Sequence, residues 1–151
     1  MPLIASTAIL RCMHEWALAE AVIEAARAAM GARPPSCLRS VTVTMGELQA
    51  IDQEIFEFAL STMLQETALS AARFVLQTEL AEFQCRACAR SWGLHDATGI
   101  TDETREAIHF LPEAAHAFVR CPACGSPDYM VSKGRGVSIK SIDVADTASC
   151  V

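Results

Sequence analysis

Two short cysteine motifs decide the fold of this chain, Cys85-Arg86-Ala87-Cys88 and Cys121-Pro122-Ala123-Cys124. Two residues between cysteines let both thiolates of a motif face one ion across a tight turn, so two motifs supply four sulfur ligands in a tetrahedron. Thiolates in that geometry select zinc or iron over harder ions, and a shell of four protein ligands leaves no open position for catalysis. The motifs predict a structural zinc site at Cys85, Cys88, Cys121 and Cys124, with rubredoxin-type iron as the chemical alternative.

Three further cysteines stand alone in the sequence, Cys12, Cys37 and Cys150. The total of seven is odd, which argues against a disulfide framework and in favour of a metal in a reducing compartment. We therefore expect Cys37 and Cys150 to be inert. The opening residues lack the basic region and cleavage site of a signal peptide, so the expected location is the cytoplasm.

The residues outside the cysteine motifs show helical and strand patterns in turn. Apolar residues recur every three or four positions from His14 to Met30, which predicts a first helix, and a second is predicted from Asp52 to Glu66. Alternating apolar residues predict strands near residues 41–45, 74–80 and 137–144. This order favours an α+β fold with two helices on a small three-stranded sheet. The cysteine segment is then a zinc-ribbon-like domain inserted between the second and third strands.

Composition excludes several classes of protein. A hydrophobic content of 52% excludes intrinsic disorder, and a net charge of −6 without a stripe of Lys and Arg argues against a nucleic-acid binder. No apolar run approaches the roughly 20 residues that span a bilayer. The chain has no phosphate-binding loop, and the predicted zinc shell is closed, so we do not expect an enzyme.

Several motifs together resemble the HypA/HybF family of nickel metallochaperones over residues 13–144. They are Met13-His14-Glu15-Trp16, the turn Gly46-Glu47-Leu48, the two cysteine motifs and a closing Gly-Val-x-Ile-x-x-Ile-x-Val strand. Trp16 and the 32 residues that separate the cysteine motifs are similar to the archaeal-type branch. The resemblance implies delivery of nickel to the [NiFe]-hydrogenase large subunit, together with the nickel GTPase HypB.

The resemblance also implies a division of the chain. Residues 13–83 with 136–151 would form the nickel-binding α+β domain, and residues 84–135 the zinc-binding insert. His14 would be the central nickel ligand, flanked by Met13 and supported by Glu15. Nickel(II) accepts a square-planar field of nitrogen donors, which a histidine beside a chain terminus can supply. We expect a monomer or weak dimer that binds neither nucleic acid nor a membrane.

One departure from the family pattern concerns the start of the chain. The family motif begins at the initiator Met, whereas twelve residues precede Met13 here. With them attached, the nitrogen of Met13 is an amide and not an amine. We expect residues 1–12 to be an extension that arises from a wrongly chosen start codon. The alternatives are that the extension is cleaved, or that the site is built differently, with Cys12 as a soft donor.

The segment between the cysteine motifs carries three histidines, His95, His109 and His116. Apolar neighbours flank His109 on both sides, which gives that stretch a reason to dock and present a side chain, so His109 is the favoured additional nickel ligand. His116 is a separate candidate because Pro112 interrupts a helix between the two. Two other functions stay open at this point, a zinc-ribbon interaction module and a rubredoxin-like electron carrier.

Overall fold

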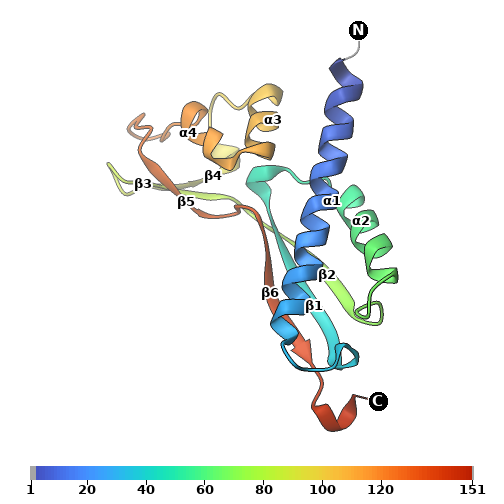
Figure 1. The fold of residues 1–151 in the computed structure, drawn as a ribbon. Coiled ribbons are helices and arrows are strands. Elements are labelled where there is room, and N and C mark those ends of the chain that lie inside the picture. Colours follow the sequence, from blue (N-terminus) through green and yellow to red (C-terminus); the bar gives the residue numbers. More distant parts are fainter. Residues whose placement is uncertain (1–2, 151) are drawn as a thin grey trace. The chain divides into compact units, whose positions relative to one another are not determined.

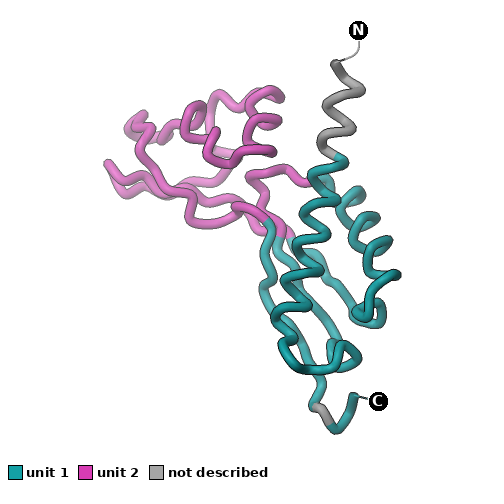
Figure 2. Tube along the Cα trace, in the orientation of Figure 1, with its two compact units in different colours: residues 1–44, 52–77, 137–151 teal, residues 45–51, 78–136 magenta. Residues whose placement is uncertain are grey.

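The structure is a computed structural model that describes residues 3–150, and the chain divides into two compact units (Figure 2). Unit 1 consists of Met1–Thr44, Asp52–Gln77 and Val137–Val151. Unit 2 consists of Met45–Ile51 and Thr78–Gly136. Among the described residues, no helix combines the length and apolar character that a membrane span requires.

Unit 1 is an α+β layer, as predicted. Its sheet has the strand order β2-β1-β6, with β1 at Leu38–Gly46, β2 at Arg73–Glu79 and β6 at Val137–Val144. Helices α1 (Leu3–Met30) and α2 (Gln53–Gln65) pack together over this sheet (Figure 1). Their apolar faces bury a core with the central strand; its members include Ala19, Ile23, Ala26, Val41, Val43, Phe56 and Leu60.

The second helix begins where its sequence predicts. The carboxylate of Asp52 accepts a hydrogen bond of 3.1 Å from the backbone N–H of Ile55, so Asp52 is the N-cap of α2. This bond satisfies one of the backbone donors that a helix start leaves without an intrahelical partner.

The first helix is longer than predicted. It starts at Leu3 and not at His14. The ten residues from Leu3 to Cys12 contain Ala, Leu and Ile but no Gly or Pro, so nothing in their backbone chemistry stops the helix from extending. Met13, His14 and Glu15 consequently lie inside α1, where backbone N–H groups bond to carbonyls four residues earlier.

Unit 2 is built on a second three-stranded sheet with the order β4-β3-β5. Its strands are β3 at Glu82–Cys85, β4 at Ser91–Gly93 and β5 at Tyr129–Lys133, and both neighbours pair antiparallel with β3. The rings of Phe83, Trp92 and Tyr129, one from each strand, lie 5.4 to 5.5 Å apart and are all buried. These aromatic contacts form the centre of the unit's core.

Two short helices complete unit 2. In helix α3 (Asp102–Phe110), Thr101 is the N-cap, and its hydroxyl oxygen accepts a hydrogen bond from the N–H of Thr104. Helix α4 spans only Ala115–Phe118, and Pro112 separates it from α3. Neither α4 nor β4 was predicted from the sequence, because elements of four and three residues are too short to show a period.

A close approach of three backbone segments shapes the base of unit 2. The carbonyl of Gly134 accepts a hydrogen bond of 3.0 Å from the N–H of Leu48, and the carbonyl of Gly136 accepts one of 2.7 Å from Gly46. A Cβ on Gly134 would overlap the backbone of Ala81, and its φ of +79° also favours glycine. Gly134 is therefore required by both space and backbone conformation.

The structure corrects the expectation that Cys37 and Cys150 are inert, because they form a disulfide bond. Strands β1 and β6 are neighbours, and the N–H of Ala145 bonds to the carbonyl of Cys37, so the start of β1 meets the end of β6. The odd cysteine total misled the prediction. Four cysteines form one cluster, two form this bond and Cys12 remains as a free thiol.

We predict that breaking this bond destabilises unit 1. The bond joins residues 113 apart, and cross-links across long loops typically stabilise a fold by about 2–4 kcal/mol by restricting the unfolded chain. Cys37→Ser and Cys150→Ser should each lower the free energy of unfolding by that amount, as measured by urea denaturation of the zinc-loaded protein. The double variant should lose no more than either single variant. Single variants as stable as the parent would show that the bond contributes nothing.

Candidate metal centres

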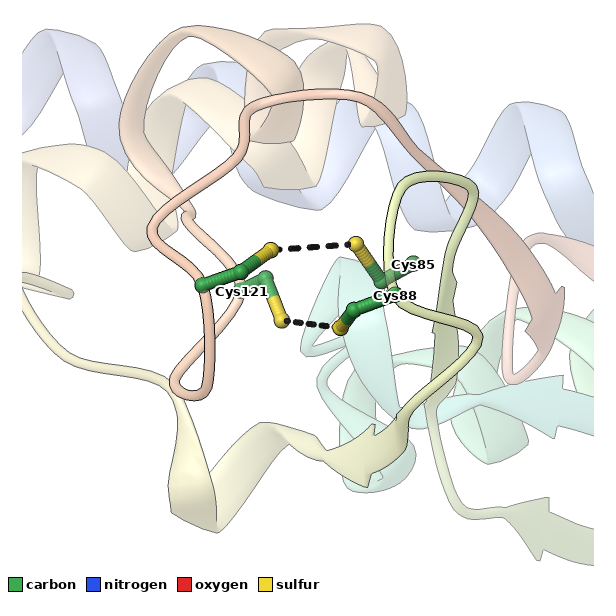
Figure 3. Close-up of side chains that lie close together, drawn as sticks. Cys85, Cys88 and Cys121 are labelled. Carbon is green, nitrogen blue, oxygen red and sulfur yellow. Dashed lines mark hydrogen bonds between the residues drawn. The ribbon is translucent and has the colours of Figure 1, made fainter.

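Four thiols converge in unit 2. Cys85 ends β3 and Cys88 follows in the adjoining turn, while Cys121 and Cys124 come from the turn that precedes β5 (Figure 3). The Sγ atoms of Cys85 and Cys124 lie 3.6 Å apart, as do those of Cys88 and Cys121. All four Sγ atoms lie within 4.8 Å of one another. The structure therefore brings together all four predicted zinc ligands.

This spacing fits a zinc ion. A tetrahedral site with Zn–S bonds of about 2.3 Å has sulfur atoms about 3.8 Å apart. The pairs at 3.6 Å are close to that separation. Four sulfur donors also match the preference of zinc for soft ligands in a closed structural shell. An ion held at this place would tie the end of β3 to the turn before β5.

The two turns that carry the cysteines are built alike. In the first turn, the backbone carbonyl of Cys85 accepts a hydrogen bond of 3.0 Å from the N–H of Ala89. In the second, the carbonyl of Cys121 accepts one of 2.8 Å from the N–H of Gly125. Both donors have positive φ, +62° at Ala89 and +73° at Gly125. The sequence singles out only Gly125 for this role. Ala89 adopts the same left-handed conformation despite its side chain, which costs on the order of 1 kcal/mol or more.

The thiols of the cluster differ in their affinity for protons. Burial disfavours the thiolate of Cys121, but hydrogen bonds from the backbone N–H groups of Cys124 and Ala123 outweigh it and lower its pKa to about 6. The N–H of Ser126 favours the thiolate of Cys124, but the thiol of Cys85 and burial outweigh it and raise its pKa to about 12. A divalent ion among the four sulfurs would displace the remaining protons.

The predicted nickel residues of α1 lie in unit 1. Met13 has 65% of its surface exposed, His14 is half-buried and Glu15 is completely buried. The Glu15 carboxylate accepts a hydrogen bond of 3.0 Å from the backbone N–H of Asp52, which is the N-cap of α2. Glu15 thus links its turn of α1 to the start of α2.

The fourth predicted nickel residue, His109, is in unit 2. It lies in the last turn of α3, is completely buried, and its Nδ1 is 2.5 Å from the carbonyl oxygen of Gln49. A carbonyl only accepts hydrogen bonds, so Nδ1 carries the proton, and in the neutral ring Nε2 then holds the lone pair that can bind a metal. This is the arrangement by which metal-binding histidines are commonly oriented. That His109 joins His14 in one nickel site stays a prediction.

The other two histidines of the insert have different surroundings. The His95 side chain is 83% exposed and lies 3.3 Å from the Asp96 carboxylate. The His116 ring stacks on Tyr129, with ring centroids 4.4 Å apart. Neither belongs to a group of three or more potential metal ligands among the residues the structure describes.

Comparison with known proteins places this chain among metallochaperones. The family described as "Hydrogenase/urease nickel incorporation, metallochaperone, hypA" matches residues 13–144. The hydrogenase maturation factors HypA of Pyrococcus abyssi and Pyrococcus horikoshii are each 42% identical to it over 133 residues, which covers 87% of this chain and 96% of theirs. HypA of Methanothermobacter thermautotrophicus is 30% identical over 132 residues.

Solved structures support the same fold. The solution structure of the Ni metallochaperone HypA from Helicobacter pylori matches with a TM-score of 0.56 at 17% identity, over 87% of this chain and 97% of that one. The predicted resemblance is thus confirmed by sequence relatives and by fold, and the four-cysteine cluster fits zinc. The chain belongs to the HypA family of hydrogenase/urease nickel-incorporation metallochaperones.

Proposed function

We propose that this protein binds Ni(II) at Met13-His14-Glu15 and delivers it, in the cytoplasm, for maturation of a [NiFe]-hydrogenase. One observation carries the proposal: the family match begins at Met13, so the Met-His-Glu motif occupies its first three residues. The nickel GTPase HypB and the hydrogenase large subunit are the proposed partners. The description of the family also names urease, which is a second possible recipient.

The chemistry of His14 and Glu15 supports a nickel site at this turn of α1. The His14 imidazole is only half-buried, so an ion can reach it and leave again, as transfer requires. Glu15 cannot leave its buried position without losing the bond to the Asp52 N–H. We infer that Glu15 positions the helical turn on which His14 stands.

The two metals are proposed to occupy different parts of the chain. Nickel is assigned to residues 13–83 with 136–151, joined by His109 of the insert, and zinc to the four cysteines of residues 84–135. Zinc held by four cysteines would be structural because no ligand position is open for exchange. Nickel would be cargo.

Two rival functions can be distinguished by simple observations. Iron in the cluster would make the purified protein red, and a zinc-ribbon interaction module would bind no nickel.

Our first prediction here concerns the zinc site. Cys85→Ala or Cys121→Ala should release the zinc ion and loosen unit 2, because each removes one of four ligands and leaves the β3 end untied. Elemental analysis should show zinc falling from one ion per chain to a small fraction. The far-ultraviolet helical signal should largely persist, since α1 and α2 belong to unit 1. Cys12→Ala is the matched control and should keep its zinc; loss of all helical signal in the cluster variants would contradict the division into units.

The second prediction concerns His14. His14→Ala should weaken nickel binding beyond the roughly 10–100-fold that changes outside a metal's direct ligands produce, because the central imidazole donor is lost. Isothermal titration with nickel measures this effect, and zinc content should not change. His95→Ala removes an exposed histidine of unit 2 and serves as the control. Equal nickel affinity in the His14→Ala protein and the parent would end the proposal.

The same titration should be run on chains that start at Met1 and at Met13. A start at Met13 converts its nitrogen from an amide into an amine, which adds a nitrogen donor beside the imidazole. The shorter chain should therefore bind nickel more tightly. Equal affinity would show that the amine is not a ligand.

The third prediction tests His109. His109→Ala should lower nickel affinity and change the visible absorption of the nickel complex, whereas His116→Ala should do neither. A histidine must be neutral to bind a metal, so nickel affinity in the parent should fall as the solution becomes more acidic. Identical spectra and affinities in both variants and the parent would remove His109 from the site.

A further inference from the structure

Unit 2 contains a polar pocket that the metal chemistry does not use. It has a volume of about 370 Å³ and lies along the first residues of β5. Arginine, histidine and tyrosine side chains that can donate hydrogen bonds line it, from Arg86, Arg135, His116 and Tyr129. The one carboxylate in its lining belongs to Asp128. A pocket so rich in donors suits a ligand that accepts hydrogen bonds.

Tyr129 also lines the pocket and is 1% exposed. Its hydroxyl group has no hydrogen-bond partner among the described residues. Burial raises the Tyr129 pKa to about 12, against the opposing charge of Arg120, so the hydroxyl keeps its proton and can donate it. The Tyr129 hydroxyl is therefore a neutral, buried donor at a residue that lines the pocket.

The exposed His116 ring packs against the buried Tyr129 ring. It stacks on the Tyr129 ring at 4.4 Å with 19° between the ring planes. Arg120 donates a hydrogen bond of 3.1 Å to the His116 carbonyl, which fixes the end of α4. The exposed His116 ring can present an N–H toward a ligand in the pocket.

The two arginines already engage carboxylates. Arg86 lies 3.5 Å from the Asp128 carboxylate, and Arg135 pairs with that of Glu113. All four side chains are more than 50% exposed, and ion pairs between exposed side chains contribute little to stability. An incoming anion can therefore exchange with them at little cost and take up the bidentate geometry that guanidinium groups offer.

We propose that this pocket binds a carboxylate group on a peptide segment of a partner protein. The two arginines and Asp128 together give the lining a net charge of +1. One carboxylate balances that charge, whereas a phosphate dianion would leave the pocket negative. The carboxylate can be a chain terminus or a Glu or Asp side chain, and both present the same two oxygens. This inference stands independently of nickel binding.

The test uses the zinc-loaded full chain and nuclear magnetic resonance of the His116 and Tyr129 rings. The probes are acetyl-triglycine with a free carboxylate, the same peptide as its amide, a doubly blocked peptide with one Glu, and inorganic phosphate at matched ionic strength. Saturable shifts are expected with the free-carboxylate peptide, the Glu peptide or both, and the stronger of the two identifies the source. The amide should produce none, and phosphate should bind more weakly.

Variants separate the pocket from general charge effects. Arg86→Gln and Arg135→Gln should each weaken carboxylate binding about tenfold. Arg90→Gln removes an exposed charge from the same cysteine turn but not from the pocket, and should change nothing. Unchanged zinc content shows that each variant is folded. Tighter phosphate binding, equal shifts with the amide, or unaltered affinity in the two pocket arginine variants would each overturn the proposal.

Discussion

The convergence of four thiols on one point is the constraint on which unit 2 depends. Unit 2 comprises only residues 45–51 and 78–136, and a core below about 70–80 residues seldom stabilises a fold without a cross-link or a metal. Its largest core contacts, among Phe83, Trp92 and Tyr129, require β3 and β5 to hold their register, in which Cys85 lies opposite Tyr129. An ion that ties Cys85 to the turn before β5 fixes this register at one end. The same ion requires four thiolates. Without it, the thiols of Cys121 and Cys124 differ in pKa, at about 6 and about 12.

Unit 1 is cross-linked by a disulfide bond. Its two helices and three strands bury a conventional apolar core, and the disulfide between Cys37 and Cys150 joins the start of β1 to the end of β6. With the disulfide in unit 1 and a proposed zinc ion in unit 2, the proposed nickel site at His14 would be separate from both cross-links. A carrier gains from this separation, because releasing its cargo then costs neither unit its cross-link.

Features that depend on neighbouring residues in the sequence were predicted well, and features that join distant residues were missed. The cysteine motifs and the helix predicted from Asp52 are local patterns, and each was found where predicted. The Cys37–Cys150 bond was missed because only the order of strands brings these distant residues together. The start of α1 was placed at His14 because the apolar period was read from there, although helix propensity permits the earlier start at Leu3. The donor-lined pocket could not be foreseen, since its residues come from three separate stretches of chain.

The long segment between the cysteine motifs gives two histidines opposite chemical roles. Pro112 ends the helical path after His109, so residues seven apart in sequence do not share a helix face. Before the break, His109 is buried, and its Nδ1 proton is committed to the Gln49 carbonyl, which leaves Nε2 with the lone pair a metal needs. After the break, His116 is exposed and stacks on the buried Tyr129 ring, so its ring N–H is accessible as a hydrogen-bond donor. One residue type therefore serves as a potential electron-pair donor on α3 and as a hydrogen-bond donor on α4, and the backbone environment decides which.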